Sequence, residues 1–467
     1  MSKKQRTRKN KTTKKKSTTP IVSKILLLII IIFIIAISAL KVSEFIVFRQ
    51  ENSFPKLEIS LKKAPIEQIN GGEKSTIYKE NTVSFTKDGQ TTDYDNVEIK
   101  GRGNYTWLLP KRSYQIKFSE KHELFSLPEA KKWILLANYA DPSYLRNDIA
   151  FHLESLLENP YATSGNFAEV YFDKHYNGLY YITEKVEINK NRVNLKDPLG
   201  VIAEIDNLHN TDETCSLVAR NGECLSIHDS VNSDNSPEGA LDFLNKFNQL
   251  EFAIAKKDYA LIEKIADIDS FAKYFLLSEF TNNPDAYSSS FFFFMDGPDD
   301  KIHAGPGWDF DMSLGNKIWT ADGVEYEAFL SPSNSMILKD HLSKDKIVDL
   351  SSPSHTERIS SIVYDLLSIP EFKARVKEIY QDTLSGKGDE LLDYIKNQAD
   401  YIRPAALRDQ ERWKLKTNFD DEVDYLIDWV AKRYDHFEQT YGANSSTETP
   451  GETIPDPAPE SQPPSKE

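Results

Sequence analysis

Residues 25–40 form a mainly apolar run without a charge, ILLLIIIIFIIAISAL, and this run constrains the chain more than any other feature. With the residues from Ile21 onward it reaches about 20 residues, the length that a helix needs to cross a hydrocarbon core about 30 Å thick. We therefore predict a transmembrane helix at residues 21–41, with Lys24 reaching toward the interface. A cleaved signal peptide is the alternative, because Ala36-Ile37-Ser38 resembles a small-residue cleavage site.

The N-terminal arm and the rest of the chain carry opposite charges. Residues 1–24 contain ten Lys or Arg and no acidic residue, so a net charge of −15 for the whole chain leaves about −25 on the remainder. The positive-inside rule places the basic arm, residues 1–20, in the cytoplasm and exports the residues after Lys41. A strongly acidic body also argues against a nucleic-acid partner, because such binding depends on Lys and Arg.

The exported part is predicted to be one folded domain with two lobes. The chain has 467 residues and 39% hydrophobic residues, enough for a packed core, and residues 52–441 show neither a repeat nor a long Pro/Gly linker. We place the first lobe at about 52–190 and the second at about 191–441. Residues 442–467 are rich in Ser, Thr, Glu and Pro and lack apolar groups to bury, which predicts a disordered tail.

The first lobe reads as a small mixed β/α unit. Residues 96–118 predict two strands around a Gly-containing loop, with Tyr114, Ile116 and Phe118 on one face of the second. Asp141-Pro142-Ser143 predicts a helix start with Asp141 as the N-cap. The segments AEVYF and GLYYIT follow as a hairpin, with its turn expected at Asn177-Gly178.

The second lobe is predicted to be mainly helical. Apolar residues at helical spacing predict helices at 240–247, 259–266, 270–280, 355–367 and 371–384. The only two cysteines, Cys215 and Cys224, lie in a polar stretch between the lobes' patterned segments. In an exported domain they can form a disulfide, and two unpaired thiols in a loop are the alternative. Neither has partners at zinc-ligand spacing.

One segment of the second lobe concentrates acidic groups around a predicted hairpin. Asp285 precedes an aromatic strand, and Trp308-Asp309-Phe310-Asp311 follows the returning strand. Antiparallel pairing can bring Asp285 and Asp309 to one cleft, where two carboxylates suit a Mg²⁺ ion whose other ligands are phosphate oxygens and water. The alternative is structural, with Asp285 forming a turn and Asp311 capping a helix.

Four separated blocks resemble the CotH kinase family of spore-coat and surface proteins. They are KGRGNYTWLLPKRSYQIKF, LRND, NGLYYITEKVE and WDFDMSLGN, and they span roughly residues 90–320. The resemblance implies an α+β fold, bilobed and atypical protein-kinase-like. It also implies transfer of the ATP γ-phosphoryl group to Ser or Thr of a protein substrate, with Mg²⁺ or Mn²⁺.

By the kinase pattern, Asp285 is the catalytic residue that orients the substrate hydroxyl and accepts its proton, and Asp309 holds the metal. Asp311 is a candidate ligand for a second ion. Position 290 departs from the family, because similar sequences commonly carry Asn where this chain has Ser290. Either Asn283 or a water compensates for it, or the domain is a pseudokinase.

The nucleotide is expected to meet residues of the first lobe. Lys117 is the candidate cation for the phosphates, and Lys111 is the reserve. The remaining candidates are a phosphate loop and a hinge segment against adenine: Gly101, Arg102, Gly103, Asn104, Glu184 and Val186. A surface lysine, an ordinary tight turn and a surface arginine are the structural alternatives. Glu154 and Asp148 are both candidates for the carboxylate that pairs with the lysine.

Two other classes of function remain open. A non-catalytic surface module in adhesion or in coat or wall assembly is favoured by Ser290, and the retention of both Asp285 and Asp309 argues against it. A metal-dependent phosphodiesterase would use the same carboxylates, but three of them without a His are few for a two-metal site. We therefore expect an extracytoplasmic, membrane-anchored protein kinase acting on Ser/Thr-bearing proteins.

Overall fold

The structure, a computed structural model, describes residues 54–205, 217–220, 224–232, 237–283, 285–287, 289–317 and 362–443. The chain divides into two compact units, residues 1–54 and 55–467, and every element described below belongs to the second. No helix in this described part is long and apolar enough to cross a bilayer. The predicted transmembrane segment 21–41 and the basic arm lie outside it, as does the tail after residue 443.

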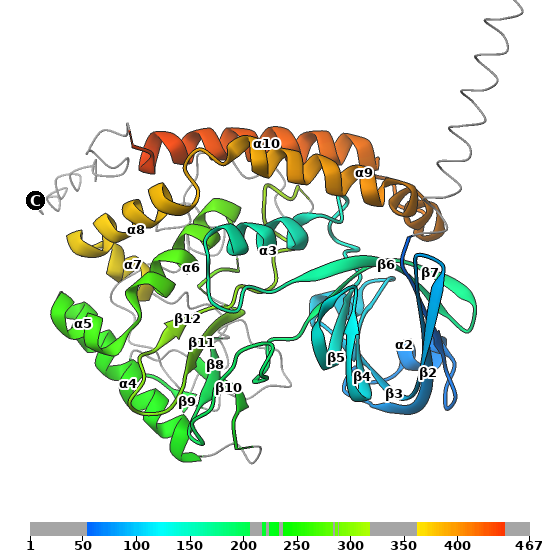
Figure 1. Ribbon diagram of the computed structural model, residues 1–467, viewed down its shortest axis with the longest axis horizontal. Coiled ribbons are helices and arrows are strands. Elements are labelled where there is room, and N and C mark those ends of the chain that lie inside the picture. Colours follow the sequence, from blue (N-terminus) through cyan, green and yellow to red (C-terminus); the bar gives the residue numbers. More distant parts are fainter. Residues whose placement is uncertain are drawn as a thin grey trace, which may run out of the picture. The chain divides into compact units, whose positions relative to one another are not determined.

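Seven strands of the first half close into a barrel in the order β1-β2-β3-β4-β5-β7-β6 (Figure 1). Neighbours are antiparallel except β1 and β6, whose parallel pairing completes the barrel. The strands are β1 (Lys56–Ser60), β2 (Tyr78–Lys87), β3 (Gln90–Arg102), β4 (Ser113–Leu124), β5 (Leu127–Leu136), β6 (Gly165–Phe172) and β7 (His175–Glu184). Two short helices, α2 (Ile66–Gly71) and the 3-10 helix η1 (Tyr105–Leu108), lie in its connections.

Alternation of side chains fills the barrel interior. On β4, Tyr114, Ile116 and Phe118 are buried in the core cluster, while Gln115 and Lys117 are partly exposed on the outer face. This is the two-faced pattern that the sequence predicts. The strands of the predicted mixed β/α lobe form a closed barrel in the structure.

The predicted hairpin forms, but its turn lies elsewhere. Asp173 and Lys174, both with positive φ, connect β6 to β7. Two such residues in succession suit the backbone twist of a two-residue hairpin turn. Asn177-Gly178 instead lies inside β7, where Gly178 pairs with Val170.

The helix after Ser143 starts later than predicted. Helix α3 spans Arg146–Leu156, with Leu145 at its N-cap position. Asp141 is not the N-cap, because the helix begins five residues later and Tyr144 between them has a φ of 63°. The Asp141 carboxylate accepts the backbone N–H of Ser143, at 3.0 Å, and that of Arg146, at 2.9 Å. It thus closes an Asx-type turn and still satisfies a donor in the first turn of α3. The helix packs against α6, and its Phe151 ring also lies 6.1 Å from the Tyr181 ring of β7, so it contacts both the helical half and the barrel.

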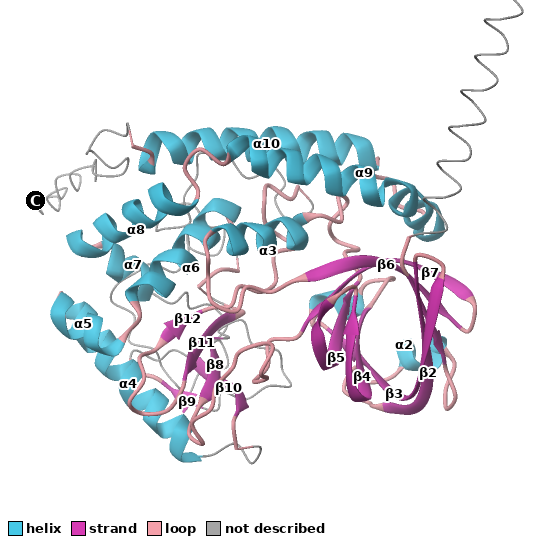
Figure 2. Cartoon of the chain, in the orientation of Figure 1, coloured by secondary structure: helices cyan, strands magenta, loops and turns pink. Residues whose placement is uncertain are grey.

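The second half contains a sheet of which the sequence predicts only the hairpin of β11 and β12. Five strands lie in the order β12-β11-β8-β10-β9 (Figure 2). They are β8 (Val201–Ile205), β9 (Leu217–Val218), β10 (Cys224–Ser230), β11 (Phe291–Met295) and β12 (His303–Ala304). The predicted helices correspond to α4 (Pro237–Ala255), α5 (Tyr259–Ile265), α6 (Ile268–Thr281), α7 (Ile362–Leu367) and α8 (Pro370–Thr383). Residues 355–361 of the fourth lie outside the described part.

Two long C-terminal helices complete the second half and were not predicted. They are α9 (Gly388–Trp413) and α10 (Phe419–Tyr441), and they pack side by side (Figure 1). Pro404 inside α9 is normally a signal for the end of a helix. The periodic signal was nevertheless present, because Leu391, Ile395, Ala399 and Ile402 recur at helical spacing and are buried.

Candidate active site

The loop between α6 and β11 is tied to the acidic loop that comes after β12. Helix α6 ends at Asn282 in a left-handed conformation, and the next residue, Asn283, is buried. The Asn283 carboxamide oxygen accepts the backbone N–H of Asp285, at 3.3 Å, and its nitrogen donates to the Asp309 carbonyl, at 3.0 Å. Asn283 therefore fixes the two predicted acidic segments beside each other.

Asp309 itself adopts a backbone conformation that is uncommon for a non-glycine residue. Its φ is 66°, and the following amide, of Phe310, donates to the side-chain oxygen of Asn147, at 2.9 Å. Such conformations persist where surrounding contacts fix them, and they are enriched at functional sites. Here the fixing contacts come from Asn147 at the start of α3 and Asn283 after α6.

The carboxylates of this region interact with one another. The pKa of Asp311 is raised well above its ordinary value by burial and by the carboxylates of Asp309, Asp285 and Asp141, while Arg146 opposes the shift. Desolvation by the surrounding protein atoms also raises the pKa of Asp309, although the residue keeps part of its surface exposed to solvent. The structure thus brings Asp285, Asp309 and Asp311 together, as the hairpin pattern predicts.

The start of helix α3 and the loop before it are hydrogen-bonded to the acidic loop. The buried Arg146 guanidinium forms an ion pair with Asp141 and donates through Nε to the Ser313 carbonyl, at 2.9 Å. Asn316 donates from Nδ2 to the carbonyls of Ala140, at 2.8 Å, and Asp311, at 2.7 Å. The LRND and WDFDMSLGN blocks are therefore two sides of one hydrogen-bonded unit.

The two candidates for a lysine-pairing carboxylate on α3 have other contacts. Glu154 is fully buried, and its Oε1 accepts the backbone N–H of Gly307, at 2.7 Å, and Nδ2 of Asn159, at 2.8 Å. Desolvation raises its pKa to about 7 despite these donors. Asp148 accepts the Tyr394 hydroxyl, at 3.1 Å, and burial raises its pKa also to about 7. Neither carboxylate forms an ion pair with a lysine in the described part of the chain.

Arg102, at the end of β3, is the cation that the barrel presents to the acidic loop. Its guanidinium lies over the Trp308 ring, 4.6 Å from the centroid. Burial lowers the pKa of Arg102, and the carboxylates of Asp309 and Glu204 oppose this change by stabilising the charged form. Glu204 lies on β8, so the strand at the centre of the second sheet also contributes to the site.

Of the residues next to Arg102, Gly101 belongs to β3, and Gly103 and Asn104 connect this strand to η1. A Cβ at Gly101 would lie 2.5 Å from ring atoms of Trp107, so the absence of a side chain lets this tryptophan pack on the strand. Gly103 has a φ of 85°, a conformation that favours glycine. Asn104 accepts a hydrogen bond from Lys74 and is exposed.

The two lysines predicted to bind phosphates have carboxylate partners of their own. Lys117 Nζ lies 3.2 Å from Glu98 on the outer face of the barrel. Lys111 is fully buried, and its Nζ lies 2.7 Å from Asp409 of α9. The structure brings neither of them to the Asp309 loop by any contact in its described part.

The segment after β7, predicted as a hinge, borders the same region. Glu184 Oε1 lies 2.8 Å from Arg192 Nε, and Val186 is buried. Lys185 lies between Glu184 and Val186. Burial and the charge of Lys132 lower its pKa to about 8, and the carboxylate of Glu187 opposes this lowering. Arg102 also contributes to this lowering, so Lys185 and Arg102 are electrostatic neighbours.

The remaining predicted ligands are less clearly placed. Ser290 is half-buried with a φ of 54°, immediately before β11. Among the described residues, no group of three His, Cys, Asp or Glu side chains is arranged to hold a metal ion by itself. Cys224 is buried at the start of β10, whereas Cys215 lies outside the described residues, so the predicted disulfide stays a prediction.

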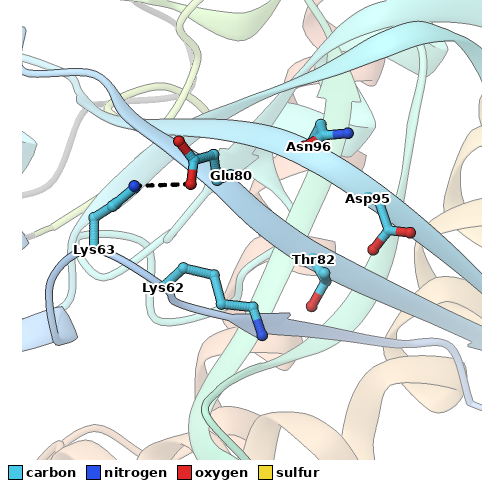
Figure 3. Close-up of a pocket in the computed structure, with 6 residues that line it drawn as sticks. All are labelled: Lys62, Lys63, Glu80, Thr82, Asp95 and Asn96. Atoms are coloured by element: carbon cyan, nitrogen blue, oxygen red, sulfur yellow. Dashed lines mark ion pairs between the residues drawn. The ribbon is translucent and has the colours of Figure 1, made fainter.

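Two hollows on the outside of the barrel are lined by none of the three site carboxylates, Asp285, Asp309 and Asp311. The first, shown in Figure 3, has a volume of about 630 Å³ and is lined by Lys62, Lys63, Glu80, Thr82, Asp95 and Asn96. A Lys63–Glu80 ion pair crosses part of it, at 2.8 Å. The second, of about 180 Å³, is lined by Ile77, Glu98, Ile99, Lys100, Gln115, Lys117 and Lys132. We assign the chemistry to the Asp285–Asp309 region because the interacting carboxylates and Arg102 are there.

Sequence reasoning missed Glu204 and His228, whose Nδ1 lies 3.3 Å from the Glu204 carboxylate, and it gave no role to the side chain of Lys185 in the predicted hinge. Glu204 lies on β8, Lys185 comes directly after β7 and His228 lies on β10, and only the tertiary fold brings these segments together. No motif marks them, because a single charged residue in a short strand is indistinguishable from a surface residue.

Comparison with known proteins identifies the family. The profile described as CotH kinase protein matches residues 99–437, more than half of the chain. The chain therefore belongs to the CotH kinase family, as the four sequence blocks predict. Among solved structures it is similar to the crystal structure of a Helicobacter pylori proinflammatory kinase, CtkA. That match has 10% identity and a TM-score of 0.23, and it covers 69% of this chain and 95% of the other. No curated protein matches the sequence.

Proposed function

We propose that this protein is an atypical protein kinase that transfers the γ-phosphoryl group of ATP to a Ser or Thr hydroxyl of a protein substrate. The observation that carries the proposal is the meeting of the Asp285, Asp309 and Asp311 carboxylates beside Arg102 in a member of the CotH kinase family. A kinase-like organisation, with the barrel as the nucleotide-side lobe, is part of the same proposal.

The residues present fit a divalent ion that is completed by its nucleotide. Mg²⁺ in nucleotide sites takes one or two carboxylates, with phosphate oxygens and water as its other ligands. Asp309 and Asp311 provide such carboxylates, and Ser290 is a further candidate. A bound Mg²⁺ or Mn²⁺ would supply charge neutralisation at the phosphates.

The chain's own groups account for the remaining chemistry. In the proposed reaction the substrate oxygen forms a bond to the γ-phosphorus, the bond from that phosphorus to the β,γ-bridging oxygen breaks, and ADP leaves. The Asp285 carboxylate orients the hydroxyl and accepts its proton. The Arg102 guanidinium, held against Trp308, provides fixed positive charge for the phosphates. It replaces Lys117 and Lys111 in our assignment because both lysines are paired elsewhere.

A catalytically weak surface module, acting in adhesion or coat assembly, is the second candidate. Ser290 stands where similar sequences carry Asn. Both ends of the Asn283 carboxamide are already engaged, by the Asp285 amide and the Asp309 carbonyl, so Asn283 is poorly placed to compensate. We retain as a proposal that residues 21–41 anchor the chain in a membrane and that the domain acts outside the cytoplasm.

Purified full-length protein incubated with labelled ATP and Mg²⁺ or Mn²⁺ tests the kinase proposal. We expect Asp285→Asn to lose transfer while keeping metal-dependent thermal stabilisation by ATP, because Asp285 acts on the hydroxyl. Asp309→Asn should lose both. Binding of ATP without transfer in the wild-type protein would favour the weak surface module instead.

A further inference from the structure

The segment directly after β7, residues 185–187, has its carbonyl groups occupied by the protein itself. The Lys185 carbonyl accepts from Nη1 of Arg192, at 3.2 Å, and the Glu187 carbonyl accepts from the amide of Val193, at 3.3 Å. The carbonyl between them, of Val186, receives Nε2 of His228 at 3.0 Å. Each of the three backbone carbonyls of this segment therefore already has at least one donor.

The Val186 carbonyl is occupied twice. Besides His228, the ammonium group of Lys185 lies 3.4 Å from the same oxygen. A carbonyl oxygen has two lone pairs, so two donors leave it little capacity for a third. Because a carbonyl can only accept, His228 must carry its proton on Nε2 to make this contact.

His228 is held in this position by its strand and by a carboxylate. Strand β10 has a bulge between Ile227 and Asp229, and bulges redirect the side chain of the extra residue. The other ring nitrogen, Nδ1, lies 3.3 Å from Glu204, which also interacts with Arg102 of the proposed phosphate site. The occupation of the Val186 carbonyl is thus built into the same region.

The amide groups of the segment show the opposite pattern. Val186 and Glu187 are both about 95% buried, and their N–H groups donate to no acceptor in the described part of the chain. The next amide, of Ile188, donates to Asp229 at 2.9 Å. Buried backbone N–H groups without a partner are rare, so these two indicate a ligand that supplies acceptors.

We propose that this segment recognises a nucleotide base through the acceptor atoms of the base alone, so that the site takes ATP and GTP alike. This inference rests on the proposed kinase function. Both purines present acceptors, such as N7, to donors like the Val186 and Glu187 amides. Adenine differs by its exocyclic amine, a donor, whose recognition needs an acceptor that the Val186 carbonyl does not offer while His228 occupies it.

The test compares the two nucleotides on full-length protein in two independent assays. Calorimetry with Mg²⁺·ATP and Mg²⁺·GTP measures affinity, and labelled γ-phosphate transfer measures kcat/KM. We expect both ratios of ATP to GTP to lie within about tenfold, since each base makes the same kind of hydrogen bond. A preference for ATP greater than about tenfold in affinity would overturn the inference and leave the kinase proposal intact.

A variant tests the part assigned to His228. His228→Ala removes one donor from the Val186 carbonyl, which can then accept from the exocyclic amine of adenine. The affinity for ATP relative to GTP should therefore rise by at least about fivefold, the typical contribution of one hydrogen bond. His175→Ala, at the exposed first residue of β7, is the matched control and should leave the ratio unchanged. An unchanged ratio in a folded His228→Ala variant would contradict the assignment. If the wild-type protein neither binds nor transfers from either nucleotide, the kinase proposal itself fails.

Discussion

Lys111 Nζ lies 2.7 Å from Asp409 Oδ1, and both side chains are fully buried. Asp409 also accepts the Tyr144 hydroxyl, at 2.8 Å, and the Leu179 amide, at 2.7 Å. The pair therefore joins the loop before β4, strand β7 and helix α9 through charged groups removed from water. Around it, Arg408 of α9 pairs with Glu169 of β6, at 2.8 Å, so α9 and the barrel share an ion-paired contact.

Removal of one member of this pair should be costly. Asp409→Ala leaves a buried, uncompensated ammonium group, and we expect the free energy of unfolding to fall by about 3–5 kcal/mol. Urea denaturation of full-length protein measures the change. Asp400→Ala, at an exposed position of the same helix, should change it by less than about 0.5 kcal/mol. Equal effects of the two substitutions would contradict a stabilising role for the pair.

Gly178 allows Asp409 to approach β7. A Cβ there would lie 2.1 Å from Asp409 Oδ1, and the φ of 131° is one that side chains rarely adopt. We expect Gly178→Ala to destabilise the fold by about 2 kcal/mol or more, through strain and displacement of Asp409. Gly71→Ala is the control, because a Cβ at that residue would have no atom within 4 Å of it. A tolerated Gly178→Ala would show that the hairpin can move away from α9.

Glu154 should make stability depend on pH. Its pKa is raised from an ordinary value of 4.5 to about 7, so between these values the folded state binds a proton that the unfolded state has lost. Stability from this group is present below pH 4.5 and declines, by about 1.4 kcal/mol per pH unit, as the pH rises toward 7. Glu154→Gln cannot titrate, so the stability of wild type minus variant should fall over this range. A difference that stays flat from pH 4.5 to 8 would contradict the assigned burial cost.

Substitutions of Arg102 and Lys117 should affect kcat/KM for ATP to different extents. Arg102→Met removes the cation beside Asp309 and should lower kcat/KM for ATP by about tenfold to a hundredfold, the value of a charge-assisted hydrogen bond. Lys117→Met should lower it by less than about threefold, because Lys117 is paired with Glu98 and about 43% exposed. Thermal midpoints of both variants control for folding. The reverse order of effects would restore Lys117 as the phosphate-binding residue.

Much of this arrangement follows from local patterns, and the rest does not. Alternation predicted the inner face of β4, and helical spacing predicted α4 to α6. Spacing around the β11–β12 hairpin predicted that Asp285 and Asp309 would meet. The prediction of a turn at Asn177-Gly178 was wrong because Gly178 lies inside β7, where it allows the close contact with Asp409, a residue more than 200 positions later. Closure of the barrel by parallel β1 and β6 likewise depends on long-range pairing that no local pattern contains.

The cations show the same limit. Lys117 is the sequence's first candidate because alternation places it on the strand face opposite Tyr114 and Ile116, and Lys111 is the reserve. Their partners, Glu98 and Asp409, are fixed by strand register and by helix packing. Arg102 became the better candidate only when the fold placed it over Trp308 and beside Asp309 and Glu204. The sequence predicted that a basic residue of this region would bind the phosphates, but the choice among Lys111, Lys117 and Arg102 required the tertiary contacts.

Transfer of labelled γ-phosphate from ATP by the wild-type protein, beside Asp285→Asn and Asp299→Asn, is the most direct test of the central claim. Asp299 is an exposed residue of the β11–β12 turn and serves as the matched control. We predict transfer by wild type and Asp299→Asn at similar rates, and a loss of about a hundredfold or more in Asp285→Asn, since it lacks the proton acceptor. Absence of transfer by the wild-type protein with either Mg²⁺ or Mn²⁺, or full activity of Asp285→Asn, would contradict the account.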